Sequence, residues 1–222
     1  MDAERFSSDR AAPEAEDVDL KYLLEAVINL LPQAILVVSS ARIPLFMNAA
    51  AKQLLERADA LLLNAGKLTA RNPRDKRRLA SCLEELGFDA TDGADRRGEW
   101  LRIERRSGMP YAVFLAPLCC AVSTTFGASR PALVLVLDVG REMSIAPIVL
   151  EELFRLTPAE ARLACILLRG QRIDAAAELL AVSVSTIRTQ VRAIFAKLHL
   201  TRQQELVRVL SALSTIMPES IS

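Results

Sequence analysis

Residues 182–200 read VSVSTIRTQVRAIFAKLHL, and this stretch decides how the C-terminal part of the chain folds. Its apolar residues recur at intervals of three and four, which places them on one side of a helix: Val184, Ile187, Val191, Ile194 and Leu198. The opposite side carries Arg188, Thr189 and Arg192, and no acidic residue interrupts it. The pattern predicts a helix over 184–198 with one buried side and one small, polar and basic side.

Two helices are expected before the quoted one. Thr157 and Glu160 have the spacing of a capping box, and they predict a helix that ends at Gly170. Asp174 is expected to cap the helix AAAELLAV, and Ser183 to cap the quoted helix after a turn of only a few residues. Two short helices joined in this way form a helix-turn-helix.

A fourth helix is expected after the quoted one. Thr201 followed by Gln204 is a second capping-box pattern. Leu206, Leu210 and Leu213 then fall on one helical face. The C-terminal part is therefore predicted to be an all-α four-helix domain.

The stretch from LTPAEARLACILLRG to IFAKLHL resembles the DNA-binding domain of the LuxR/FixJ family of bacterial transcription regulators, over about residues 155–213. The matching positions are Leu156, Thr157, Glu160, Gly170, Ala177, Leu180, Val182, Ser183, Thr186, Ile187, Arg188, Lys197 and Leu198. The resemblance implies that Arg188, Thr189 and Arg192 contact bases in the major groove, where arginine can donate two hydrogen bonds to guanine. It also implies that Thr186, Gln190 and Lys197 contact phosphates.

Three positions depart from the family pattern. Gln190 stands where histidine is usual, and its amide can still donate to a phosphate. His199 stands where glycine is usual, so it is expected to be a left-handed turn residue, not a catalyst or a ligand. Ala175 replaces a frequent acid and removes one surface contact.

The charge is unevenly placed along the chain. The net charge is +1, but the segment from Phe154 onward has nine basic and five acidic residues, which gives it +4 and leaves −3 for the rest. A basic C-terminal segment joined to a mildly acidic N-terminal segment indicates a polyanion-binding module with a separate control domain.

The N-terminal part begins with an amphipathic helix, Leu20–Leu31, which Pro32 ends. The run AILVVSS predicts a buried strand, and Ile43–Met47 its hairpin partner. Asn48 can cap AAAKQLLE. A helix from Pro73 through Leu86 and three late strands complete this part, the strands being Trp100–Arg105, Tyr111–Leu118 and Leu133–Val139.

This order of elements resembles the PAS family, as does RIPLFMNAAAKQLLE with Asn48 before its first short helix. No cofactor is expected. A haem would need an axial histidine, but the only histidine is His199 in the other domain, and no cysteine lies in the asparagine-cysteine-arginine motif of light-sensing flavin domains. A small hydrophobic ligand, or no ligand, is expected instead. The aromatic residues Phe46, Trp100, Tyr111 and Phe114 are expected in the core.

Several other classes of protein are disfavoured. A phosphorylated receiver domain would need acids where this chain has Ser39 and Ser40. The chain has no Walker loop and no GxSxG elbow, so we expect no enzyme and no catalytic residues. Four cysteines without CxxC spacing and one histidine indicate no metal site and buried, reduced thiols. The first 18 residues are polar and acidic, which predicts a disordered start, no membrane segment and a cytoplasmic protein.

The sequence thus predicts an α+β chain: an N-terminal PAS-like antiparallel sheet with short helices, plus a C-terminal all-α four-helix helix-turn-helix domain. The expected divisions are a disordered segment 1–18, a PAS-like sensor or dimerisation domain 19–139, a linker 140–154 and a LuxR-type DNA-binding domain 155–222. The expected function is a bacterial transcription regulator that binds double-stranded DNA as a homodimer and reads the major groove with helix 184–198. RNA polymerase and a small-molecule ligand are candidate further partners. The alternative is a sensor or protein-interaction module that contacts a sigma factor or another protein without reading DNA.

Overall fold

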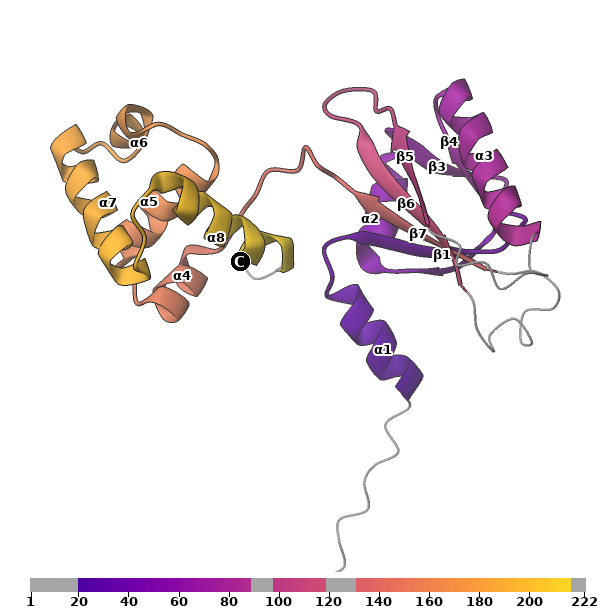
Figure 1. Ribbon diagram of the computed structural model, residues 1–222, viewed down its shortest axis with the longest axis horizontal. Coiled ribbons are helices and arrows are strands. Elements are labelled where there is room, and N and C mark those ends of the chain that lie inside the picture. Colours follow the sequence, from indigo (N-terminus) through magenta and orange to yellow (C-terminus); the bar gives the residue numbers. More distant parts are fainter. Residues whose placement is uncertain (1–19, 89–97, 119–130, 217–222) are drawn as a thin grey trace, which may run out of the picture.

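The computed structural model describes residues 20–88, 98–118 and 131–216. In this part an antiparallel sheet with short helices is followed by a group of helices only (Figure 1). The expected α+β fold class is confirmed. The expected disordered segment 1–18 and the cysteines at 119 and 120 lie outside the described residues.

The sheet consists of β1 (Ala34–Val38), β2 (Pro44–Met47), β5 (Glu99–Ile103), β6 (Tyr111–Pro117) and β7 (Ala132–Leu137). Their spatial order is β2-β1-β7-β6-β5, and each neighbouring pair is antiparallel. Val136 of the central strand lies opposite Ala34 on one side and Val113 on the other, and all three are buried. The alternation of these strands therefore gives the sheet one buried face.

That buried face is covered by α2 (Ala49–Arg57), α3 (Pro73–Phe88) and a hairpin of β3 (Leu61–Asn64) and β4 (Lys67–Ala70). Tyr111 is in this core, as expected, but Trp100 is 54% exposed and packs against Phe114, with ring centroids 4.9 Å apart and ring planes tilted by 43°. The hairpin was not predicted, because the run of three leucines that starts it does not alternate. Its turn residues, Ala65 and Gly66, have φ values of 49° and 74°, as in a type I′ turn.

Asn48 joins three elements at one edge of the sheet. It caps α2, because its Oδ1 accepts hydrogen bonds from the backbone N–H groups of Ala51 (2.9 Å) and Ile35 (3.0 Å). Its Nδ2 donates to three backbone oxygens near the end of α1 (Leu20–Asn29), those of Ile28, Leu31 and Gln33. The side chain is fully buried, and its donors and acceptor are all used.

The helical group consists of α4 (Pro147–Phe154), α5 (Pro158–Leu168), α6 (Ile173–Leu179), α7 (Val184–Leu198) and α8 (Gln203–Ile216). The segment expected as a linker thus contains a helix, α4. Its Val149 and Leu150, and Ile145 before it, are buried in the same core as α5 to α8. Most of that segment packs with the helical group, because its apolar residues have a core to cover.

Two of the expected helix starts were wrong in detail. The N-cap of α6 is Arg172, which makes no side-chain capping hydrogen bond, and Asp174 lies in the first turn. Before α8, Glu205 and not Gln204 completes the start. Its Oε2 accepts from the backbone N–H groups of Thr201 (2.8 Å) and Arg202 (3.2 Å).

Replacing Asn48 with alanine is expected to lower the free energy of unfolding of the sheet domain by about 3–4 kcal/mol, because several buried backbone groups lose their partner. The matched control is Asn29→Ala. Asn29 is exposed, and its Oδ1 accepts one hydrogen bond, from the backbone N–H of Ala49 (2.8 Å). Its replacement should lower the free energy of unfolding by about 1 kcal/mol. Urea unfolding followed by Trp100 fluorescence measures both, and equal costs would show that Asn48 does not join these elements.

Candidate nucleic-acid interface

Helices α6 and α7 form the expected helix-turn-helix. Their axes are bent by 110° at the turn, where the backbone N–H of Val182 donates to the oxygen of Ala177 (3.0 Å). Helix α5 packs against both, and α8 packs against α5. Among the described residues no single helix is long and apolar enough to cross a membrane; α6 and α7 meet that length and composition test only as a bent pair.

The two ends of α7 are fixed by its own sequence. Ser183 caps the first turn, since its Oγ accepts from the backbone N–H of Thr186 (3.1 Å) and also pairs with the Thr186 hydroxyl (2.8 Å). His199 ends the helix in the left-handed conformation, with φ 54° and ψ 41°, as expected. The backbone N–H of Leu200 then bonds to the oxygen of Phe195 (2.9 Å).

One side of α7 is buried and the other is exposed. Ile187 and Ile194 are fully buried in the helical core. Arg188, Thr189 and Arg192 are exposed together on the other side. Within the described residues neither arginine makes a hydrogen bond or ion pair to the rest of the chain, so both guanidinium groups are available to a partner.

Thr189 differs from its two arginine neighbours because its hydroxyl is occupied. Its Oγ1 donates to the backbone oxygen of Ser185 one turn earlier (3.1 Å). Its methyl group takes no part in that hydrogen bond. Such a residue suits contact with a thymine methyl group and leaves space for the helix to approach base edges.

The three residues assigned to phosphates lie in different surroundings. Thr186 is exposed at the start of α7, where backbone N–H groups favour an anion. Gln190 is half-buried, and the amide atom assigned as Oε1 is enclosed without a partner among the described residues. Lys197 is engaged by the chain itself.

Glu160 holds Lys197, a contact that the sequence analysis missed. The Lys197 Nζ donates to Glu160 Oε2 (2.6 Å) and to the backbone oxygen of Arg155 (3.0 Å). The same Oε2 accepts from the backbone N–H of Thr157 (2.7 Å) and closes the expected capping box of α5. One carboxylate thereby ties the last turn of α7 to the first turn of α5.

This arrangement changes the titration of Glu160, whose side chain is only 9% exposed. Burial alone would raise the pKa of Glu160, but the hydrogen bonds from Lys197 and Thr157 outweigh it and hold this pKa below its usual value. The carboxylate therefore stabilises the folded helices at every pH at which it is ionised.

The site has no features of a metal centre or a reactive thiol. Among the residues described, no group of three or more histidine, cysteine, aspartate or glutamate side chains is arranged to hold a metal ion. Cys165 is half-buried on α5, and its Sγ donates to the backbone oxygen of Ile145 (3.3 Å). Burial raises the pKa of this thiol, which keeps it protonated and unreactive.

No protein-family model and no curated protein sequence matches the chain. Among solved structures, the phage VqmA–DPO complex is 17% identical over 91% of this chain and 95% of that chain, with a TM-score of 0.34. The VqmA dimer of Vibrio cholerae, described among LuxR-type receptors, is 13% identical over 88% of each chain, with a TM-score of 0.33. The PAS domain of Bordetella pertussis BvgS is 14% identical over 62% of this chain and 96% of that chain, with a TM-score of 0.36. These likenesses are weak, so the function has to be assigned from the residues of this chain.

The Glu160–Lys197 pair is expected to show coupling in a double-mutant cycle. Glu160→Gln keeps the shape of the cap but removes the charge, and Lys197→Met removes the ammonium group. The double variant should lose about 1–2 kcal/mol less unfolding free energy than the sum of the losses of the two single variants, because each single change already removes the shared ion pair. Hydrogen exchange of the α5 and α7 amides measures these free energies, and additive costs would contradict the pairing.

The loss of unfolding free energy caused by Glu160→Gln is also expected to depend on pH. Because the folded-state pKa of Glu160 is lowered, its contribution is full above the unfolded value of about 4.3 and is lost as the pH falls through the folded value. The stability difference between the wild-type and variant chains should therefore be largest near neutral pH and narrow below about pH 4. A difference that stays constant with pH would show that the carboxylate charge contributes nothing.

Proposed function

We propose that the protein is a bacterial transcription regulator that binds duplex DNA as a homodimer, reads bases in the major groove with α7, and is controlled by its PAS-like sheet domain. The observation that carries the proposal is the exposed side of α7. Arg188 and Arg192 lie there, one turn apart, on a helix whose opposite side is locked into a core. Rigid presentation lowers the entropy that such side chains lose on binding.

Charge supports duplex DNA over a protein partner for this surface. The segment from Phe154 onward has a net charge of +4, and the exposed side of α7 holds two free guanidinium groups and no acid. Phosphate contacts supply most of the sequence-independent affinity for DNA, and bidentate arginine contacts supply base preference. The alternative, a module that contacts a sigma factor or another protein without reading DNA, would use apolar groups. Leu179, which is 66% exposed near the turn before α7, is an apolar contact that such a protein partner would use. In a regulator bound to DNA, the same residue would be available to RNA polymerase.

Helix α1 supports the homodimer. Leu20, Leu23 and Val27 share one side of it, and they are 64%, 50% and 51% exposed. In Figure 1 this helix leads away from the sheet instead of lying on it. A second copy would cover this stripe. The other candidate surface, on α8 near Val207 and Ser211, is already half-buried in its own domain.

The route of the chain supports control by the sheet domain. Strand β7 ends at Leu137, and residues 138–146 connect it to α4, whose Leu150 is fully buried with α5 to α8. A change at the end of β7 would therefore reach the helical core through a short connection. We propose the cytoplasm as the location, since the DNA of a bacterium lies there.

Arg188→Ala is expected to weaken binding of a preferred DNA site by about 1–3 kcal/mol and to relax the base preference at one position. Arg192→Ala should do the same at a neighbouring position. The matched control is Arg208→Ala on α8, which removes the same charge from an exposed residue away from α7. Fluorescence anisotropy with specific and mismatched duplexes measures these changes. If all three variants show the same affinity and the same base preference, the exposed side of α7 does not read the bases.

Leu23→Glu is expected to shift the free protein from dimer to monomer, because a charge would enter a paired apolar stripe. Tyr22→Glu is the matched control, since Tyr22 is exposed on another side of α1. Sedimentation velocity measures the oligomeric state. A wild-type chain that is monomeric both free and on a two-fold symmetric DNA site would contradict the homodimer.

A further inference from the structure

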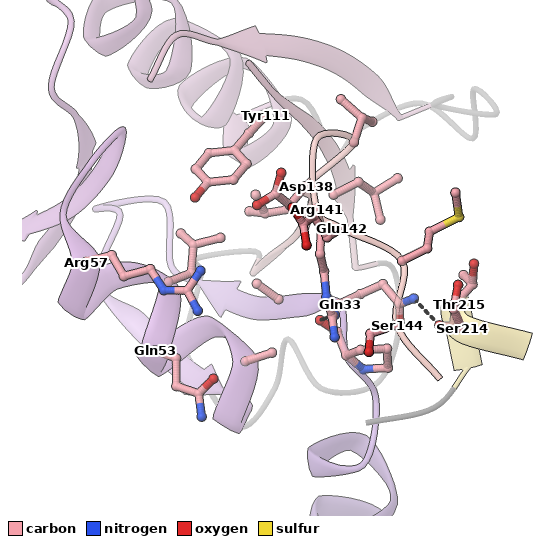
Figure 2. A pocket seen from close by; sticks show the side chains of 18 residues that line it. Gln33, Gln53, Arg57, Tyr111, Asp138, Arg141, Glu142, Ser144, Ser214 and Thr215 are labelled. Carbon is pink, nitrogen blue, oxygen red and sulfur yellow. Dashed lines mark hydrogen bonds between the residues drawn. The ribbon is translucent and has the colours of Figure 1, made fainter. Parts of the chain in front are cut away.

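A pocket of about 350 Å³ opens at one end of the inner strands of the sheet, between α2, the ends of β1, β6 and β7, and the connection to α4 (Figure 2). Small-molecule sites have volumes of about 300–1,000 Å³, so this pocket fits a ligand at the small end of that range. Ala34, Leu54 and Val136 form an apolar wall. The rest of the lining mixes apolar residues with polar and charged ones, among them Arg141 and Glu142, which carry opposite charges.

A partly buried charge cluster lies at the inner end of the pocket. Arg105 Nη1 donates to both carboxylate oxygens of Asp138 (3.0 Å each), and Arg105 Nε donates to Asp59 Oδ2 (2.8 Å). The hydroxyl of Tyr111 donates to Asp59 Oδ1 (3.2 Å), and the Arg105 guanidinium lies 4.3 Å from the centre of the Tyr111 ring. The three charged side chains are only 16–20% exposed.

The cluster carries one more negative charge than positive charge, because two carboxylates share one guanidinium. Burial, together with the nearby charge of Asp59, raises the pKa of Tyr111 to about 12. The phenol therefore stays protonated, and its O–H donates a hydrogen bond to Asp59. Tyr111 and Asp138 line the pocket, and their oxygen atoms can accept further hydrogen bonds. The inner end therefore offers hydrogen-bond acceptors and favours a cation or an N–H donor.

The opposite wall offers a positive charge. Arg57, in the last turn of α2, extends into the pocket in Figure 2, facing the side from which Asp138 enters. Its guanidinium makes no hydrogen bond or ion pair with another described residue. A guanidinium group recognises a carboxylate through two parallel hydrogen bonds.

We propose that this pocket binds a small zwitterion of the amino-acid class. Its ammonium group would donate to Asp138 and to the Tyr111 oxygen, its carboxylate would meet Arg57, and a short side chain would lie on Ala34 and Val136. This rests on the proposed function and deepens it, since it names the class of ligand to which the sheet domain responds.

The same pocket touches the helical group. Asp138, Val139 and residues 141–144 of the connection line it, and so do Ser214 and Thr215 near the end of α8. Gln33 Nε2 donates to the backbone oxygen of Thr215 (2.8 Å), a contact drawn in Figure 2. A ligand here would contact the sheet domain, the connection and α8 at once. If it fits one placement of the helical group better than another, its binding shifts the population toward that placement.

Isothermal titration calorimetry of the full-length chain with each of the common L-amino acids tests the proposal. At least one is expected to bind with a Kd below about 1 mM. Its decarboxylated amine and its deaminated acid, which each lack one charged end, should bind at least about tenfold more weakly. The proposal is overturned if no amino acid binds, or if either analogue binds as tightly as the amino acid.

Arg57→Met gives the sharpest variant, because Arg57 is exposed and its replacement should leave the fold intact. It should weaken binding of the amino acid by about tenfold or more and leave binding of the amine unchanged. Lys52→Met, an exposed position on α2 outside the pocket, is the matched control and should bind like the wild-type chain. Equal affinities for Arg57→Met and Lys52→Met would also overturn the site.

The outcomes separate this inference from the proposed function. The Arg188→Ala, Arg192→Ala double variant should bind the amino acid normally, because α7 does not line the pocket. Amino-acid binding in a chain that never binds DNA would keep the pocket and refute the regulator. DNA binding in a chain that binds no amino acid would keep the regulator and refute the pocket.

Discussion

The carboxylate of Glu160 is the interaction on which the presentation of α7 depends. It accepts from the Thr157 backbone at the start of α5 and from Lys197 at the end of α7, so one buried group connects the two helices. A buried carboxylate without these donors would be strongly unfavourable, and the helices therefore keep the one arrangement that supplies them. The apolar packing of Ile187 and Ile194 then leaves the arginine side of α7 facing outward.

The same contact changes how the basic residues of the helical group divide their roles. Lys197 resembles a phosphate contact by its position in the sequence, yet its ammonium group is occupied by Glu160 and Arg155. Its ammonium group has three N–H donors, so one remains beyond the two that hold the helix. Arg188 and Arg192 have no such partner within the described residues. Under the proposed function, different cations on one helix would therefore hold the helix in place and read the bases.

Much of this arrangement was predictable from the sequence, where the physical cause is local. The apolar spacing of helix 184–198, the Ser183 cap and the left-handed His199 are each determined within a few neighbouring residues, and all three are confirmed. The hairpin over 61–70 was missed, because its turn lacks the usual asparagine-glycine pair and its leucines do not alternate. Lys197 and Glu160 are 37 residues apart, and the carboxylates that share Arg105 are 33 and 46 residues from it. No local pattern reports such pairs, so the ion pair and the pocket emerge only from the fold.

The central claim is that two copies of the exposed α7 side read bases in duplex DNA. Selection of bound sequences from a pool of random duplexes by the purified full-length chain tests it most directly. We expect an enriched, two-fold symmetric pair of half-sites, separated centre to centre by about one helical turn of 10–10.5 base pairs or a multiple of it. Recovery of DNA without any enriched sequence, or of no DNA at physiological salt, would contradict it.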